Sequence, residues 1–315
     1  MAPADDYVDI LILGAGWTSQ FLVPHLRAEG LKYRLTTTSG KTNKLCEGKY
    51  DESIIIPFAF QPTPDSSTFA HVPHLTSDQE DAQYNQLPTA QTIIITFPLK
   101  GRGQAKKLVE KYKQSHTGAI NTQWIQLGST GVWKETNPFQ IQDQDSPIEI
   151  NDRAIAEEEL RELGGSVLCL AGLWGDERVP WNWVKKIAPT KDKLREKKSL
   201  HLIHGDDVAR ACLAYHQKKF VGGERWIVTD QQVYDWWELI EAWSKPLEKI
   251  NAEQSVKPEY AKWIAELKRE QELKKLPRSH QQLGRVLNSS DFWKAVGIEP
   301  RHVLKRTASD IVSQL

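Results

Sequence analysis

Short apolar runs rich in β-branched residues alternate with segments whose apolar positions recur at helical spacing. The runs predict buried strands, and the periodic segments predict helices that cross over between them. This alternation is typical of an α/β fold with a doubly wound parallel sheet. The predicted strands span residues 9–13, 33–37, 53–58, 92–97, 123–127 and 166–170, and the predicted helices span 18–28, 103–115 and 152–163.

The pattern changes after residue 171, where Trp174, Trp181 and Trp183 lie in a loop-rich stretch. Residues 62–88 are polar and rich in Pro, Ser, Thr and Asp, which predicts a long loop with one helical turn. Further along, periodicity and charge predict one short strand and three helices. The strand covers 226–229, and the helices cover 206–218, 234–243 and 261–275.

Composition narrows the class of protein. The 315 residues include 41 basic and 41 acidic ones, so no global charge favours nucleic acid or an anionic membrane. No apolar run reaches the length of a membrane span, and the acidic N-terminus lacks the apolar core of a secretory signal. The three cysteines are far apart and odd in number, which favours a reducing compartment and no metal site. We therefore expect a cytoplasmic protein.

The segment from Val8 to Leu22 carries the strongest local signal. It reads as a buried strand, a turn with Gly14 and Gly16, and the start of a helix. Such a turn directs backbone N–H groups and a helix N-terminus toward a phosphate. Ser19 stands where a third glycine is usual. The context predicts dinucleotide binding by Gly14, Gly16, Trp17, Thr18 and Ser19; the alternative is a plain strand–helix turn.

Five segments spread over nearly the whole chain carry recognisable patterns. They are GAGW at 14–17, GSTGVW at 128–133, LAGLWGDER at 170–178, LIHGDDVA at 202–209 and the stretch 288–298. In this order they resemble the motifs of the extended short-chain dehydrogenase/reductase family, which includes nucleotide-sugar epimerases. The Gly-x-Gly-Trp turn is similar to that of its atypical members. The resemblance implies a Rossmann domain over 1–175 that binds NAD(P) and a small interleaved α+β substrate domain over 176–315, with 200–230 returning to the first.

The resemblance also assigns chemistry. In typical members a Ser orients the substrate oxygen, a Tyr transfers the proton and a Lys four residues later lowers the pKa of that Tyr. Ser129 matches the first role, but Arg153 and Glu157 occupy the other two positions. No Tyr lies between Tyr112 and Tyr215, so no shift of register restores the pair. The usual proton transfer is therefore in doubt.

Two explanations compete. In the first, another group is the acid or base: Glu157 beside Arg153, or His204. Each of these residues also has a purely structural interpretation. Arg153 and Glu157 could form an i,i+4 ion pair on the helix surface, and His204 could shape the strand end and cap a helix. In the second, the chain binds its cofactor without turnover and acts as a regulatory or sensor protein. A third class is a structural fold that has lost even the cofactor.

The end of the second predicted strand carries hydroxyls and lysines and no carboxylate. Thr38, Ser39, Lys41 and Lys44 therefore favour NADP over NAD, since an acid there would repel a 2′-phosphate. The alternative is a solvated polar loop in which the two lysines face water. By the resemblance, Phe97 and Pro98 cover the cofactor's ribose. A small polar or sugar-linked substrate would then meet a set of residues that the family places around its cleft: Thr130, Trp133, Trp174, Arg178 and His204. For the tryptophans core packing is the alternative, and a homodimer through helices 103–115 and 152–163 is also implied.

Overall fold

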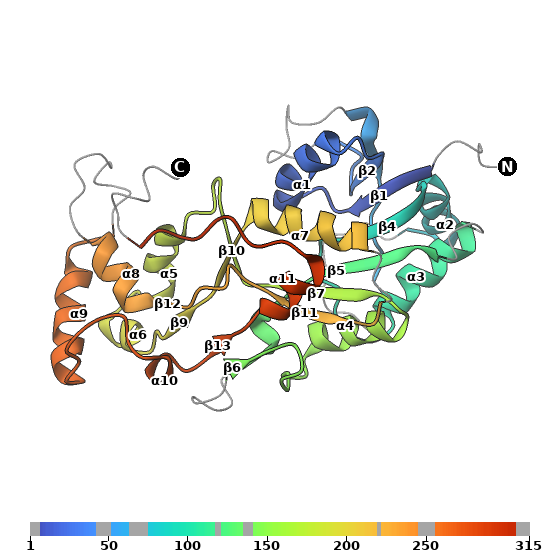
Figure 1. Cartoon of the computed structure of the whole chain (residues 1–315). Coiled ribbons are helices and arrows are strands. Elements are labelled where there is room, and N and C mark those ends of the chain that lie inside the picture. The colour runs from blue at the N-terminus through green and yellow to red at the C-terminus, as the bar shows by residue number, and fades with distance from the viewer. Residues whose placement is uncertain are drawn as a thin grey trace. The chain divides into compact units, whose positions relative to one another are not determined.

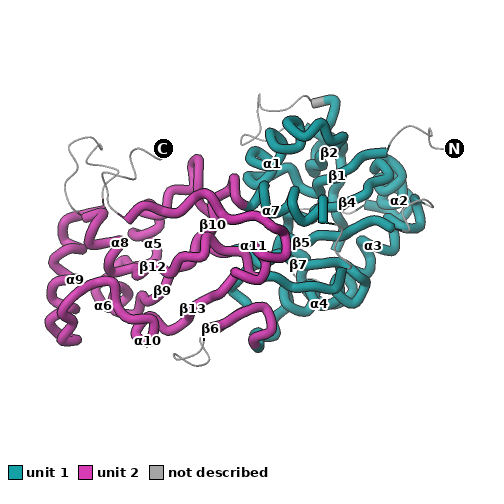
Figure 2. Tube along the Cα trace, in the orientation of Figure 1, with its two compact units in different colours: residues 1–132, 147–170, 208–226 teal, residues 133–146, 171–207, 227–315 magenta. Residues whose placement is uncertain are grey.

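The computed structural model describes residues 7–41, 52–62, 75–116, 121–134, 141–218, 222–244 and 256–306. Figure 1 shows the chain, and Figure 2 shows its two compact units. Unit 1 comprises Met1–Val132, Pro147–Leu170 and Val208–Trp226, and unit 2 comprises Trp133–Ser146, Ala171–Asp207 and Ile227–Leu315. Residues 133–146 and 171–175, expected with the first domain, thus group with unit 2, and the returning segment is 208–226.

A seven-stranded parallel sheet forms the centre of unit 1, in the order β3-β2-β1-β4-β5-β7-β11. The order reverses direction at β1, with β2 on one side and β4 on the other. This doubly wound topology is the Rossmann arrangement. The strands are β1 (Tyr7–Leu13), β2 (Tyr33–Thr37), β3 (Ile55–Pro57), β4 (Thr89–Ile95), β5 (Gln123–Ser129), β7 (Ser166–Leu170) and β11 (Arg225–Val228), the last of which continues into unit 2.

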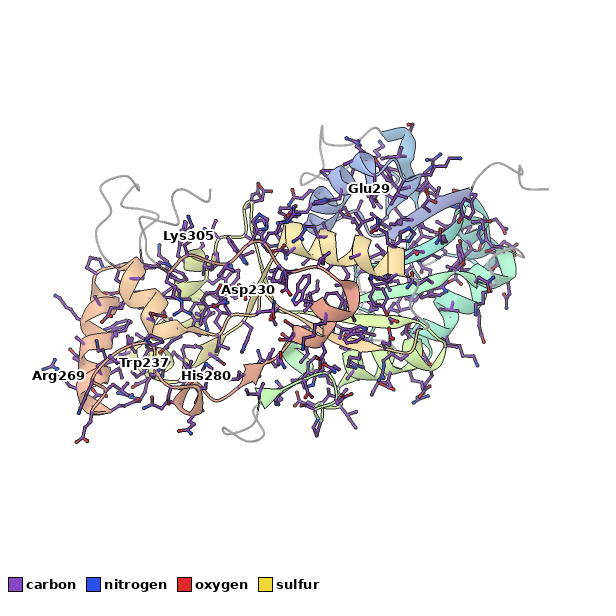
Figure 3. The ribbon with its side chains drawn as sticks, viewed as in Figure 1. Glu29, Asp230, Trp237, Arg269, His280 and Lys305 are labelled. Atoms are coloured by element: carbon purple, nitrogen blue, oxygen red, sulfur yellow. The ribbon has the colours of Figure 1, made fainter. Side chains whose placement is uncertain are left out.

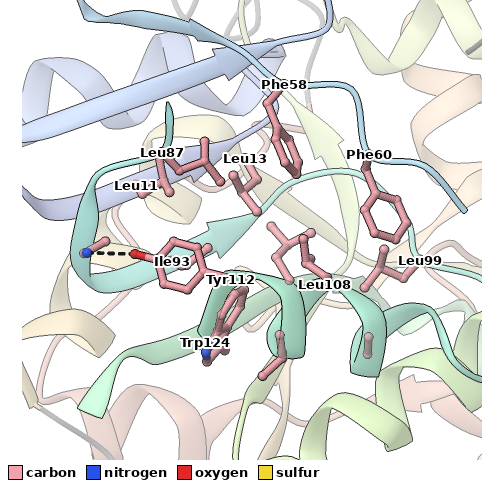
Figure 4. Close-up of a cluster of buried hydrophobic side chains, with 14 of the residues drawn as sticks. Leu11, Leu13, Phe58, Phe60, Leu87, Ile93, Leu99, Leu108, Tyr112 and Trp124 are labelled. Atoms are coloured by element: carbon pink, nitrogen blue, oxygen red, sulfur yellow. Dashed lines mark hydrogen bonds between the residues drawn. The ribbon is translucent and has the colours of Figure 1, made fainter. Parts of the chain in front are cut away.

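The central strands are buried on both faces, which explains their unbroken apolar sequences. Leu11 and Leu13 of β1 belong to a core cluster with residues of β4 and the neighbouring helices (Figure 4). The side chain of Tyr112 is buried in this core, and its hydroxyl makes two hydrogen bonds. It donates to the Pro88 carbonyl at 2.8 Å and accepts from the Ala90 N–H at 2.9 Å. The buried phenol therefore ties a helix to the start of β4.

Helices cover both faces of this sheet (Figure 1). On one face α2 packs on α3, and α3 packs on α4. On the other face, α7 approaches β4 closely enough for Nδ1 of His216 to lie 2.7 Å from the Thr92 hydroxyl. The helices are α1 (Trp17–Ala28), α2 (Ser77–Gln86), α3 (Gln104–Ser115), α4 (Asp152–Glu162) and α7 (Gly205–Lys218), and two 3₁₀ turns occur at η1 (Glu52–Ile54) and η3 (Thr130–Val132).

Helix α2 corrects the expectation of a loop over residues 62–88. It has ten residues but buries only Glu80 and Tyr84, so it lacks the apolar periodicity that marks a helix in sequence. Its stability comes from other features. Thr76 and Gln79 form a capping box at its start, and Glu80 pairs with Lys107 of α3 at 2.8 Å.

Within its described residues, unit 2 has three short strand pairs rather than one large sheet. β8 pairs with β10 and β6 with β13, both parallel, while β9 and β12 are antiparallel. These strands are β6 (Ile141–Gln142), β8 (Gly172–Trp174), β9 (Ser199–Leu200), β10 (Leu202–His204), β12 (Tyr234–Asp235) and β13 (Val286–Leu287). The helical elements are η4 (Pro180–Trp183), α5 (Val184–Ile187), α6 (Lys191–Arg195), α8 (Trp236–Trp243), α9 (Glu259–Glu270), α10 (His280–Leu283) and α11 (Ser290–Val296).

Tryptophans dominate the core of unit 2. Trp237, labelled in Figure 3, is fully buried and donates its indole N–H to the Leu194 carbonyl at 2.8 Å. The Arg278 guanidinium lies 4.0 Å from its ring centroid and also pairs with buried Asp235. Asp235 in turn accepts from the Trp237 N–H, so α8 begins two residues later than the predicted helix 234–243.

Among the described residues, none of the helices has both the length and the apolar character that a bilayer crossing requires.

Candidate functional site

The turn after β1 is fixed by hydrogen bonds from two neighbouring strands. The Gly14 N–H donates to the Thr36 hydroxyl at 3.0 Å, and the Thr96 hydroxyl donates to the Gly14 carbonyl at 2.6 Å. Gly14 has φ of +97°, and an added Cβ would lie 2.5 Å from Oγ1 of Thr96. Only glycine fits such a position without strain.

Gly16 has a different environment. It is the residue before α1, and a Cβ added there would meet no atom within 4 Å. The space in front of this backbone is therefore open, as the approach of a phosphate requires. Helix α1 has no side-chain cap on its first turn, so its N-terminal N–H groups remain suited to an anion.

A cavity of about 510 Å³ opens beside this turn and has lining residues from the ends of four adjacent strands. We call it the switch-point cavity, because it lies at the carboxyl edge where the strand order reverses. Ligands of open α/β sheets bind at this location. Its lining comprises residues 14–16, 36–38, 58–60 and 96–98, all in unit 1 and none of them charged.

The three threonines of the lining have different roles. The Thr36 hydroxyl accepts from the Gly14 N–H and so holds the turn after β1, whereas the Thr37 hydroxyl donates to the Lys41 carbonyl at 2.9 Å and organises the turn after β2. Thr38 is exposed and lines the cavity with its hydroxyl unused within the described chain. Of the expected neighbours, Ser39 accepts from the Lys41 N–H at 3.4 Å, and exposed Lys41 lies at the end of this turn. Lys44 lies outside the described residues.

Aromatic rings form one wall of the switch-point cavity. Phe60 and Phe97 stack with centroids 5.9 Å apart, and Pro98 continues this wall. The other predicted cofactor residues lie behind the turn: Trp17, Thr18 and Ser19 are all buried in α1. Ser19 is fully buried, and its hydroxyl lies 3.5 Å from the Gly14 carbonyl. Thr36, Thr96, Phe58 and Phe60 were missed by sequence reasoning; their only signal was their place at strand ends.

Ser129 ends β5 at the same edge of the sheet. Its hydroxyl accepts from the Gly131 N–H at 3.2 Å, which fixes the following 3₁₀ turn and leaves the oxygen partly exposed. Neighbouring Thr130 is buried. Ser129 therefore places a hydroxyl at the carboxyl edge of the sheet, and its role toward a substrate stays a prediction.

Glu157 is placed differently from the expected helix-surface pair. Its side chain is 2% exposed, and each carboxylate oxygen is bound to a guanidinium: Oε1 to Nε of Arg153 at 3.1 Å, and Oε2 to Nη1 of Arg225 at 2.5 Å. The i,i+4 pair with Arg153 does form, but Glu157 also pairs with Arg225, so its buried carboxylate joins two guanidinium groups in an ion triad. Both oxygens of this carboxylate are thus bound to guanidinium groups inside the protein. Arg225, 68 residues away, had no sequence signal.

His204 caps a helix, which is the structural role that the sequence offered as an alternative to catalysis. Its Nδ1 accepts from the Asp206 N–H at 3.1 Å, in the first turn of α7. Its ring stacks on His302 at 4.2 Å and packs edge-on against Trp174. Burial, with a smaller effect of His302, lowers the pKa of His204 to about 4, so the imidazole is neutral near pH 7.

The other predicted substrate residues lie in unit 2. Trp133 is fully buried and donates its indole N–H to the Ser146 carbonyl at 3.1 Å. Trp174 is buried in the tryptophan-rich core, while Arg178 is exposed and closes a turn with Gly175. Trp133 and Trp174 therefore pack in the core, and Arg178 is the one of these three whose side chain faces solvent.

Unit 2 also contains a cluster of potential metal ligands. Asp206, Asp207 and His302 place one ligand atom each within 4.8 Å of one another. Buried Asp207 already accepts the backbone N–H groups of Arg301 and His302, at 2.9 Å and 2.7 Å. The cluster thus holds the segment after α11 against the start of α7.

No protein-family model and no curated protein matches the chain in sequence. Solved structures match its fold over nearly its whole length. Yeast methylglyoxal/isovaleraldehyde reductase Gre2, complexed with NADPH, is 16% identical, with a TM-score of 0.64 and 97% of each chain covered. The terminal R domain of the myxalamid pathway is 16% identical, with a TM-score of 0.59 over 99% of this chain and 91% of that chain.

A third match is MoeE5, solved in complex with UDP-glucose and NAD. It is 12% identical, with a TM-score of 0.54 and 97% of each chain covered. Identities this low show the fold and nothing finer. The chain therefore shares a Rossmann fold with these proteins, which is the fold implied by the resemblance of its motifs to the extended short-chain dehydrogenase/reductase family.

Proposed function

We propose that this chain binds NADP(H) in the switch-point cavity and acts as an atypical short-chain reductase or epimerase on a small polar or sugar-linked substrate. The carrying observation is the open space in front of Gly16, at the uncapped start of α1 and beside a cavity of about 510 Å³. A pyrophosphate needs such a backbone approach, and an adenosine needs a pocket of this kind.

The residues around the cavity fit the parts of a dinucleotide. The Gly14–Gly16 turn and the start of α1 would bind the pyrophosphate. Phe60 and Phe97 supply apolar faces, and Thr38 supplies a hydroxyl for the adenosine ribose. NADP is favoured over NAD because the lining carries no carboxylate, while Lys41 follows Thr38 on the same turn.

The reaction itself would take place beside Ser129, whose hydroxyl would orient a carbonyl or hydroxyl of the substrate. The bound nicotinamide would supply hydride transfer. We do not assign proton transfer to Glu157, because both oxygens of its buried carboxylate are engaged in ion pairs with arginines. The proton must then come from another group or from water. A homodimer through α3 and α4 and a cytoplasmic location remain predictions.

The burial of Glu157 favours a second candidate function. A chain that keeps the dinucleotide cavity but fills the proton-transfer positions with a buried ion triad would serve as a non-catalytic NADP(H) sensor. Such a protein would change its affinity for a partner when the cofactor binds.

Titration calorimetry with NADPH and NADH tests the shared part of both candidates. NADPH should bind more tightly, and Lys41→Ala should reduce this preference, whereas Lys32→Ala, which removes a cation away from the cavity, should not. Equal or absent binding of both dinucleotides would defeat the proposal.

Turnover separates the two candidates. A panel of small aldehydes, ketones and nucleotide sugars is assayed for NADPH oxidation or epimerisation. Activity that falls in Ser129→Ala at unchanged NADPH affinity supports the enzyme. No turnover, together with a partner whose binding depends on NADPH, supports the sensor.

A further inference from the structure

We infer that the guanidinium of Arg153 is a preorganised anion site at the carboxyl edge of β5, and that it selects a substrate bearing a carboxylate. The inference rests on the proposed function in one respect: it assumes that the substrate binds at this edge of the sheet. It assigns Arg153 to recognition of the substrate and gives it no part in proton transfer.

Two hydrogen bonds fix the guanidinium. Its Nε donates to Oε1 of Glu157 at 3.1 Å, and its Nη2 donates to the Leu127 carbonyl at 3.1 Å. An arginine carries five N–H donors, so most of them have no partner within the described chain. The side chain is 32% exposed, and those donors can therefore be reached from solvent.

The charges around Arg153 do not cancel it. Glu157 is shared with Arg225, which is 3% exposed and binds the second carboxylate oxygen. Glu158 pairs with Arg161 at 2.7 Å and lies 3.5 Å from Arg225. Three guanidinium groups thus pair with two carboxylates, which leaves one positive charge in excess within this cluster. The carboxylate of Asp152 makes no ion pair within the described residues, so it does not remove that charge.

Hydrogen bonds and chain position connect Arg153 to both the switch-point cavity and Ser129. The Leu127 carbonyl that Arg153 binds also accepts from Nε2 of Gln126 at 3.3 Å. The same amide donates to the Phe97 carbonyl at 2.9 Å, and Phe97 lines the switch-point cavity. Ser129 follows Leu127 by two residues on the same strand.

The chemistry of the donor set identifies the anion. A planar guanidinium with free donors on one side matches the two oxygens of a carboxylate. Arg153 also lies in the first turn of the 11-residue α4, where the helix dipole favours negative charge. A carbonyl oriented by Ser129 and a carboxylate held by Arg153 would belong to a 2-oxo acid or a similar small acid.

A pair of small probes tests this assignment on the full chain without dinucleotide. Pyruvate carries a carboxylate beside its carbonyl, and hydroxyacetone has the carbonyl without the carboxylate. In calorimetric or NMR titrations, pyruvate should bind and hydroxyacetone should bind more weakly. Arg153→Gln should weaken pyruvate binding by about tenfold or more, the loss expected for a charged hydrogen-bonded pair.

Two further variants sharpen the result. Arg153→Lys keeps the charge but lacks the fork, so it should bind pyruvate with intermediate affinity, and it replaces Arg153→Gln if that variant does not fold. Lys106→Gln removes an exposed cation from the neighbouring α3 and should leave pyruvate affinity unchanged. The inference is overturned if wild-type protein does not bind pyruvate, or if both Arg153 variants bind it as the wild type does. Failure of NADPH binding, measured separately, would instead defeat the proposed function.

Discussion

Nη1 of Arg225 on β11 lies 2.5 Å from Oε2 of Glu157 on α4, and both side chains are almost fully buried. The pair crosses beneath β5, where a Cβ added to Gly128 would lie 2.8 Å from Oε1 of Glu157. A buried carboxylate is costly unless cations and hydrogen bonds surround it. Glu157 meets that condition because both Arg225 and Arg153 bind its carboxylate. We therefore expect Glu157 to stabilise the fold of unit 1.

Glu157→Gln should therefore destabilise the fold strongly. The substitution keeps the volume of the side chain but leaves buried Arg225 with only the more distant carboxylate of Glu158, at 3.5 Å, and breaking a buried pair costs about 3–5 kcal/mol. Urea-induced unfolding of purified variants measures the change in free energy. Glu158→Gln is the matched control, because Glu158 is 45% exposed and its pairs should contribute at most about 1 kcal/mol. Equal losses in the two variants would show that the triad has no special structural role.

The sequence specified the doubly wound sheet well because its strands carry their own signal. β2 and β7 begin and end where predicted: β7 is a fully buried apolar run, and β2 combines an aromatic and β-branched residues before the turn that follows it. β4 spans Thr89–Ile95 rather than 92–97: its first three residues, Thr-Ala-Gln, carry no apolar run, and Phe97 is apolar without belonging to the strand. Phe97 lines the cavity instead. Helix α2 was missed because capping and ion pairs, rather than an apolar stripe, hold it.

The candidate site was only partly accessible to sequence reasoning. Gly14 and Gly16 have a local motif, and their geometry follows from it. Arg225 contacts Glu157 across 68 residues of chain, and no local pattern encodes a pairing at that separation. Position and spacing therefore predicted that Arg153 and Glu157 stand where the resemblance expects Tyr and Lys, but the pairing of Glu157 depends on Arg225, which only the fold brings close.

The two glycines of the β1 turn should separate stability from binding. Gly14→Ala forces a positive φ on a residue with a Cβ and a contact of 2.5 Å with Thr96, so it should cost about 1–3 kcal/mol of folding free energy. Gly16→Ala meets no atom of the protein, and should cost less than about 1 kcal/mol.

Gly16→Ala should lose little stability and yet bind NADPH much more weakly. The new methyl group of Gly16→Ala occupies the space that the pyrophosphate needs, so NADPH affinity should fall by about tenfold or more, the equivalent of about 1.4 kcal/mol. Calorimetry gives the affinity, and thermal unfolding without ligand gives the stability. If Gly16→Ala binds NADPH as tightly as the wild type does, the pyrophosphate does not bind at this turn.

Asp230, labelled in Figure 3, should make the stability of unit 2 depend on pH in an unusual direction. Its side chain is buried and accepts from the Tyr234 hydroxyl at 2.6 Å. Burial, and to a smaller extent the charge of Asp207, raises the pKa of Asp230 to about 7. The folded state thus retains a proton that the unfolded chain, with a carboxyl pKa near 3.8, has already lost.

The sign follows from proton linkage. Between about pH 4 and pH 7 the folded state binds more protons at this site than the unfolded state, so this carboxyl lowers the unfolding free energy as the pH rises. Each pKa unit corresponds to about 1.4 kcal/mol. Asp230→Asn removes the proton equilibrium while keeping the side-chain shape. Urea unfolding of both proteins at pH 4.5 and pH 7.5 should show the variant gaining stability relative to the wild type at the higher pH. A constant difference between the two proteins across this range would mean that Asp230 titrates normally in the folded chain.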